Sequence, residues 1–177
     1  HLAPVRRELG IRTIFNLLGP LVNPLVPTGQ VLGVYHRELV PRLAAVLGQL
    51  GRQKYLVVHG SPGLDECTTT GPTWVAWGNG ETVRELVIDP EALGLQLVGV
   101  ADLRGGDVRE NAAILKAVLQ GKGTRPQTEI VALNTAAALL VAGKVDTWEE
   151  GVSEALHCIG SGLPWLKLEQ LIAIYPG

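Results

Sequence analysis

The sequence predicts an α/β fold in which a central, mostly parallel sheet is flanked by helices. Two short apolar runs, residues 29–35 and 55–58, are typical of buried strands, and a helical stretch from Pro41 to Gly51 separates them. A strand, a helix and a strand within roughly thirty residues form a βαβ unit, whose strands pair in parallel. After Asp107 the chain is mostly helical in pattern, which supplies layers to cover such a sheet.

Composition excludes several classes of function. The chain has 177 residues, of which 46% are hydrophobic and 18% charged, so it can build one domain with a real core. A net charge of −2 argues against a nucleic-acid partner, and no apolar run is long enough to span a bilayer. Cys67 and Cys158 lack metal-site or disulfide spacing, which is compatible with a reducing cytoplasm.

The segment before the first strand predicts a helix. Apolar residues recur every three or four positions over residues 11–18, and we expect Gly19-Pro20 to end that helix. Three arginines accompany the segment: Arg6, Arg7 and Arg12. They are either a solvated face or a site that holds an anion bidentately, which arginine does better than lysine.

The middle and the end of the chain follow simple local signals. Residues 74–77 and 82–87 predict a hairpin through Gly78-Asn79-Gly80, and residues 89–106 are expected to be irregular. Helices are then expected after the N-cap Asp107, over residues 129–142, after the N-cap Thr147, and over residues 164–174.

Two adjacent carboxylates, Asp65 and Glu66, stand in a glycine-bounded loop directly after the strand that ends at Gly60. Ligands of open α/β sheets collect beyond the carboxyl ends of the strands. Burying two like charges without partners costs several kcal/mol each, so they are either solvated or bound to something positive. Magnesium is usually held by one or two carboxylates together with phosphate oxygens. The simpler alternative is an ordinary surface turn.

Motifs that cover essentially the whole chain point to a family. They are residues 3–21 with Asn23-Pro24, residues 58–60 with 63–66, residues 102–107 with 110–112, and residues 134–137. Together they resemble the anthranilate phosphoribosyltransferases, tryptophan-biosynthesis enzymes with a nucleoside phosphorylase/phosphoribosyltransferase-like fold. The first motif is long and specific, so a chance match is improbable.

The resemblance implies an activity and a set of binding residues. The reaction joins the amino group of anthranilate to phosphoribosyl pyrophosphate (PRPP), and Mg²⁺ stabilises charge on the departing pyrophosphate. Asp65 and Glu66 match the pair that holds Mg²⁺. Arg6 matches an arginine that contacts anthranilate, while Gly19 and Pro20 match residues that line its channel. No residue is assigned a catalytic role.

The resemblance also implies an incomplete enzyme. We find no counterpart of the family's glycine-rich diphosphate loop or of its small helical N-terminal domain. Residues 1–177 are therefore expected to be a single α/β domain, the C-terminal part of a longer cytoplasmic homodimeric enzyme, and inactive alone. Two alternatives stay open: a pyrimidine nucleoside phosphorylase-like enzyme, and a non-catalytic nucleic-acid-binding relative of the same fold.

Overall fold

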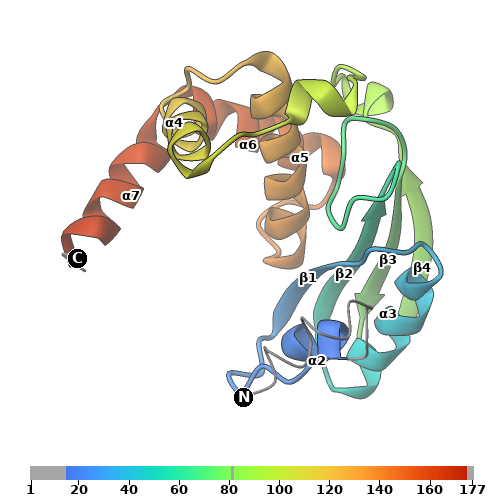
Figure 1. Cartoon of the computed structure of the whole chain (residues 1–177). Coiled ribbons are helices and arrows are strands. Elements are labelled where there is room, and N and C mark those ends of the chain that lie inside the picture. Colours follow the sequence, from blue (N-terminus) through green and yellow to red (C-terminus); the bar gives the residue numbers. More distant parts are fainter. Residues whose placement is uncertain (1–14, 81, 175–177) are drawn as a thin grey trace, which may run out of the picture.

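A four-stranded sheet forms one half of the molecule, and helices form the other (Figure 1). The computed structural model describes residues 15–80 and 82–174. The strands lie in the order in which they occur in the chain: β1 (Gly29–Gly33), β2 (Lys54–Gly60), β3 (Thr73–Asn79) and β4 (Thr82–Ile88).

The strand directions confirm the βαβ unit and correct the expected sheet. β1 and β2 are parallel neighbours joined by α3 (Leu39–Gln49), as predicted. β2 pairs with β3 and β3 with β4 in antiparallel fashion, so the sheet of the described residues is mixed rather than mostly parallel. The reason is the connections: β3 and β4 are joined by a tight hairpin through Gly80, and no crossover helix separates β2 from β3.

Strand β2 is buried on both faces. Tyr55 and Val57 pack toward α3, while Leu56 and Val58 pack toward α5 (Arg125–Val141). Because successive side chains of a strand point to opposite faces, one apolar run fills two cores. The result is the expected three-layer arrangement of helix, sheet and helix.

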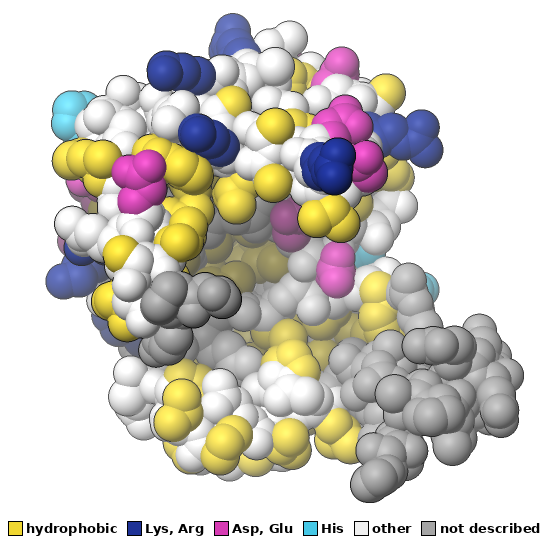
Figure 2. All heavy atoms as spheres, turned by 60° about the vertical axis from the view of Figure 1, so that its left-hand side comes forward, with side chains coloured by type: hydrophobic (Ala, Val, Ile, Leu, Met, Phe, Trp, Pro, Cys, Tyr) yellow, Lys and Arg dark blue, Asp and Glu magenta, His cyan; other side chains and the backbone are white. Residues whose placement is uncertain are grey.

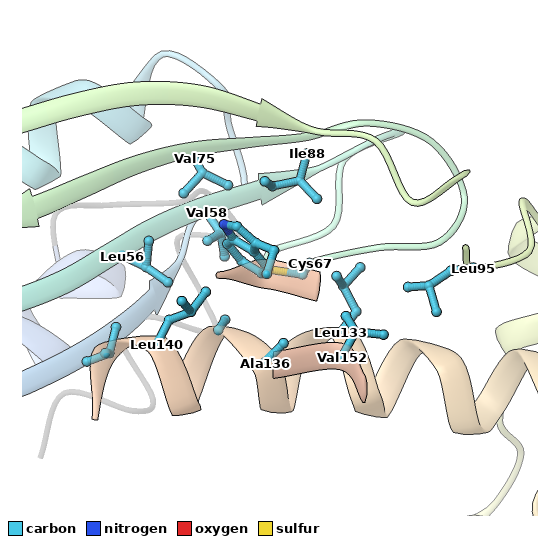
Figure 3. Close-up of a cluster of buried hydrophobic side chains, with 13 residues drawn as sticks. Leu56, Val58, Cys67, Val75, Ile88, Leu95, Leu133, Ala136, Leu140 and Val152 are labelled. Atoms are coloured by element: carbon cyan, nitrogen blue, oxygen red, sulfur yellow. The ribbon is translucent and has the colours of Figure 1, made fainter. Parts of the chain in front are cut away.

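The larger core lies between the sheet and α5 (Figure 3). In that view Leu56, Val58 and Val75 of the strands face Leu133 and Leu140 of the helix. Ala136 and Ala137 of α5 also belong to this core and are fully buried. A Cβ added to Gly151 of α6 (Trp148–Gly160) would stand 2.8 Å from the Cβ of Ala136, so small residues here let the two helices pack closely.

The second half of the chain is helical, as predicted. It contains α4 (Val108–Leu119), α5, α6 (Trp148–Gly160) and α7 (Leu163–Ile174). The predicted N-caps are confirmed: Asp107 Oδ1 accepts from two main-chain N–H groups of α4, and Thr147 Oγ1 accepts from Glu150 N. Helix α5 begins four residues before the expected start, because Thr124 caps it through Gln127 N. None of the helices within the described ranges is long and apolar enough to cross a bilayer.

The first helix was expected to end at Gly19-Pro20, and this prediction is wrong by one residue. Helix α2 (Phe15–Leu21) runs through Pro20 to Leu21. Val22 N still donates to Leu18 O at 2.9 Å, so the last turn is closed although Pro20 has no N–H to donate. The part of this segment before residue 15, including Arg6, lies outside the described residues.

The position of Leu140 gives a test of the core. Leu140 is 1% exposed between α5 and the sheet, so we expect Leu140→Ala to lower the free energy of unfolding by about 2–5 kcal/mol. Val108→Ala is the control, because Val108 is 86% exposed and should cost at most about 0.5 kcal/mol. Urea denaturation followed by circular dichroism measures both, and equal losses would contradict the assignment of the core.

Candidate functional site

The carboxylate loop, residues 61–72, carries Asp65 and Glu66 from β2 to β3. It begins with a tight return in which Gly60 N donates to Leu64 O and Leu64 N donates to Gly60 O, each at 2.8 Å. The loop therefore folds back directly at the carboxyl end of β2. Because β1 and β2 are parallel, their carboxyl ends share this edge of the sheet. Both carboxylate residues are exposed there, as the sequence predicted.

Two glycines let the main chain of the carboxylate loop lie against the strand ends. A Cβ added to Gly33 would stand 1.6 Å from the carbonyl oxygen of Asp65. A Cβ added to Gly60 would stand 2.5 Å from the carbonyl oxygen of Glu66. Any side chain at Gly33 or Gly60 would overlap these carbonyl oxygens, so only glycine fits. The main chain of β1 therefore contacts that of Asp65, and the main chain of β2 contacts that of Glu66.

The two carboxylates carry negative charge that no described side chain neutralises. The one ion pair among residues 15–80 and 82–174 joins Arg125 to Glu129, and neither Asp65 nor Glu66 has a hydrogen-bond partner for its carboxylate there. Partial burial raises the pKa of Glu66, and the neighbouring charge of Asp65 raises it further. The loop thus holds two like charges together with no counter-charge from the part of the chain that the structure describes, which favours the binding of a cation.

The donor set fits magnesium better than most other metals. Within the described parts of the chain, no group of three or more His, Cys, Asp or Glu side chains is arranged to hold a metal ion. Zinc sites use three or four nitrogen or sulfur ligands, and calcium sites use six to eight oxygens. Magnesium instead accepts one or two carboxylates and takes its other oxygens from water and phosphate. Asp65 and Glu66 match that pattern.

A cavity of about 810 Å³ opens beside the carboxylate loop. Leu64 and Glu66 of the loop line one side, Leu103 and Arg104 line another, and Ile130 and Asn134 of α5 belong to its wall. Figure 2 shows a hollow on this face with mostly hydrophobic side chains in it and acidic side chains along one side. An apolar hollow with a few polar groups is the usual form of a small-molecule site.

Comparison with known proteins shows the family of the chain. Residues 1–164 match the family described as "Glycosyl transferase family, a/b domain". The chain belongs to this glycosyl transferase family. Among curated relatives, the anthranilate phosphoribosyltransferase of Thermosynechococcus vestitus is 49% identical over 174 residues, which are 97% of this chain and 51% of that protein. The enzyme of Prochlorococcus marinus is 51% identical over 171 residues, which are 97% and 49% respectively.

Solved structures of glycosyl transferase relatives share the fold. The anthranilate phosphoribosyltransferase of Thermus thermophilus has a TM-score of 0.89 and 41% identity, covering 98% of this chain and 51% of that chain. The enzyme of Saccharomyces cerevisiae in complex with PRPP and Mg has a TM-score of 0.87 and 32% identity, with 98% and 50% covered. This chain thus spans about half the length of the relatives that it matches.

The structure separates the two groups of residues that the family resemblance had suggested. Gly19 and Pro20 are exposed on α2, where Pro20 O accepts from Gln30 Nε2 at 3.0 Å. Gln30 lies near the start of β1, whereas Gly33, which contacts the carboxylate loop, lies at its end. Three residues of strand separate these points by about 10 Å, and Figure 1 shows α2 and the loop at opposite ends of β1. Asp65 and Glu66 lie together, but Gly19 and Pro20 do not join them.

Sequence reasoning missed two contributors to the site. The sequence pattern places Gly33 only in a strand, whereas in the structure its lack of a side chain makes room for Asp65. The sequence pattern places Asn134 only in a helix, whereas in the structure its amide hydrogen-bonds the main chain of the carboxylate loop. The available signal was an asparagine within the mostly apolar stretch from Ile130 to Val141, because a half-buried amide needs partners.

A substitution at Gly33 tests whether the carboxylate loop packs against the end of β1. Gly33→Ala places a methyl group against main-chain atoms that cannot rotate away, so the loop must shift, at a cost of about 1–3 kcal/mol. Gly160→Ala is the matched control, since an added Cβ there meets nothing within 4 Å, and it should be neutral or stabilise by up to about 1 kcal/mol. Thermal unfolding measures both variants. A Gly33→Ala chain as stable as the control would show that the loop does not press on β1.

Proposed function

We propose that this chain forms the metal-binding and anthranilate-binding part of an anthranilate phosphoribosyltransferase, which transfers phosphoribosyl from PRPP to the amino group of anthranilate in tryptophan biosynthesis. The observation that carries the proposal is the pair of adjacent carboxylates, Asp65 and Glu66, at the carboxyl edge of β1 and β2, where no side chain of the described residues neutralises them. Support comes from relatives of that name that are 49–51% identical over nearly the whole chain.

In this proposal Asp65 and Glu66 hold Mg²⁺. The ion supplies charge stabilisation for the pyrophosphate that leaves during the transfer. The chain's own part is to keep two hard oxygen donors side by side, with their main chain seated on Gly33 and Gly60. The solved structure of a yeast relative is in complex with PRPP and Mg, which supports the choice of metal.

Anthranilate is proposed to bind through Arg6, Gly19 and Pro20. A guanidinium recognises a carboxylate through paired, charge-assisted hydrogen bonds, which suits the carboxylate of anthranilate. Residues without bulky polar side chains suit its flat aromatic ring. A yeast relative in complex with 4-fluoroanthranilate supports an aromatic acid as the ligand. No general acid or base is proposed, because holding both substrates in reactive alignment is the main catalytic contribution.

The 177 residues are proposed to be inactive alone, because they span about half the length of their relatives and the reaction requires both substrates to be held. A homodimeric, cytoplasmic enzyme is the setting proposed for the whole protein. Both cysteines are free thiols, which supports a reducing compartment. The relatives reported above favour this function over a nucleoside phosphorylase, and a net charge of −2 gives no support for nucleic-acid binding.

The metal assignment predicts the behaviour of a double variant. Asp65→Ala with Glu66→Ala should abolish Mn²⁺ binding by this chain, with Mn²⁺ as the probe for Mg²⁺, and abolish Mg²⁺-dependent turnover in a polypeptide of the relatives' length. The fold should be unchanged because both residues are exposed. Glu154→Ala with Glu169→Ala removes the same charge from exposed helix positions and should bind Mn²⁺ as the parent does. Turnover that persists in the first variant at low Mg²⁺ would refute the assignment.

The anthranilate assignment predicts a selective kinetic effect of Arg6→Ala. Loss of a charge-assisted hydrogen bond to a carboxylate costs about 1.5–3 kcal/mol, which is roughly a ten- to hundredfold rise in the KM for anthranilate. The KM for PRPP should hardly change. Steady-state kinetics in a polypeptide of the relatives' length measures both constants. Arg7→Ala and Arg12→Ala are the controls. Equal rises in both KM values, or the same effect from either control, would overturn the role of Arg6.

A further inference from the structure

The side chain of Asn134 joins helix α5 to the carboxylate loop through one residue of that loop. Cys67 N donates to Asn134 Oδ1 at 2.9 Å, and Asn134 Nδ2 donates to Cys67 O at 2.8 Å. The same Nδ2 also donates to Ile130 O of its own helix at 3.0 Å. The amide is therefore held in a single orientation by three hydrogen bonds, two of which reach the loop.

Only an amide of this length satisfies the arrangement. The main chain of Cys67 presents one donor and one acceptor, and Cys67 is fully buried, so both groups need partners within the protein. An asparagine offers a carbonyl oxygen and an NH₂ group side by side, which matches both. Aspartate would accept the first hydrogen bond but could not donate the second, and leucine, of similar shape, would leave both groups unsatisfied.

The hydrogen bonds of Asn134 hold the loop next to the acidic pair. Cys67 directly follows Glu66, so fixing its main chain fixes the exit of the segment that carries both carboxylates. On the other side, Asp65 O and Glu66 O lie against Gly33 and Gly60. The next hydrogen bond to a residue outside the loop is donated by Thr68 N to Thr73 Oγ1 of β3 at 3.1 Å, two residues past Glu66. The acidic pair is thus held between the strand ends and the amide of Asn134.

We propose that Asn134 is a positioning residue for the metal site: it clamps the main chain at Cys67 so that Asp65 and Glu66 point at one cation. The proposal rests on the proposed function, in which these carboxylates hold Mg²⁺. Asn134 acts through the loop, because its hydrogen bonds to Cys67 and Ile130 occupy its amide and none reaches a carboxylate. Two adjacent like charges repel each other, so without the clamp the loop separates them and the site is lost.

The experiment uses the buried thiol of Cys67 to report whether the loop opens, because iodoacetamide reaches this thiol only when the loop moves away from α5. The chain contains two cysteines, and Cys158 is exposed, so Cys158→Ser leaves the buried Cys67 as the single thiol. In that background we compare Asn134→Leu, the milder Asn134→Asp, and the control Leu140→Val, which weakens the packing of the same helix away from the loop. Two quantities are measured under native conditions: the rate at which iodoacetamide labels Cys67, and the dissociation constant of Mn²⁺.

The expected result is specific to the clamp. Asn134→Leu should label at least tenfold faster than Leu140→Val and bind Mn²⁺ at least tenfold more weakly, while Leu140→Val keeps the parent Mn²⁺ affinity within twofold. Asn134→Asp, which keeps one of the two hydrogen bonds, should lie between them in labelling rate. Circular dichroism confirms that each variant is folded, and if Asn134→Leu does not fold, Asn134→Asp carries the comparison.

Three results would overturn the proposal. Labelling no faster than in Leu140→Val would show that Asn134 does not hold the loop. Faster labelling with unchanged Mn²⁺ affinity would show that the clamp does not position the carboxylates. A parent chain that does not bind Mn²⁺ would remove the metal role of the clamp, and this result alone would also count against the metal assignment in the proposed function.

Discussion

The burial of β2 on both faces is the constraint on which the rest of the structure depends. Six of its seven residues are buried, and their side chains alternate between the core under α3 and the core under α5. A slip of one residue would exchange the two sets, placing Tyr55 where Leu56 now packs. The strand is thereby fixed in register against both helices, and the point at which it ends is fixed as well. The carboxylate loop begins at that point, so the core determines where Asp65 and Glu66 emerge.

The loop itself combines a rigid main chain with unfavourable charges. Its backbone is seated on glycines and hydrogen-bonded by Asn134, whereas its two acidic side chains have no counter-charge within the described chain. Placing like charges side by side lowers stability, and a well-packed sheet can tolerate that cost. Such a combination is typical of a binding site, because the ligand provides what the protein lacks.

Local signals in the sequence predicted most of the elements, and contacts between distant residues account for what was missed. Periodicity and capping residues located the helices after Asp107, the βαβ unit and the hairpin at Gly80. The mixed strand directions follow from how β3 returns beside β2, which no local pattern shows. The seat of Asp65 on Gly33 and the bond between Asn134 and Cys67, which are 67 residues apart, exist only after folding. A sequence shows that two carboxylates are neighbours, but it does not show which distant residues hold their loop in place.

The separation between α2 and the carboxylate loop bears on how the proposed site is assembled. In the proposed function a metal-bound donor lies at the carboxyl end of β1 and an acceptor lies beside α2 near its start, so the two substrates must meet along this strand, across about 10 Å. Among the described side chains of α2, Gly19 and Pro20 are exposed and Leu21 is partly buried at the edge of the core under α3, while Gln30 Nε2 of β1 donates a hydrogen bond to Pro20 O.

A helix of seven residues gains little stability from its own hydrogen bonds, so its position is set by what it packs against. The carboxylate loop is instead seated by contacts that the described residues make, at Gly33, Gly60 and Asn134. The metal half of the proposed site is therefore built by the 177 residues themselves. Turnover additionally requires both substrates to be held, which is why metal binding and turnover are expected to separate in this protein.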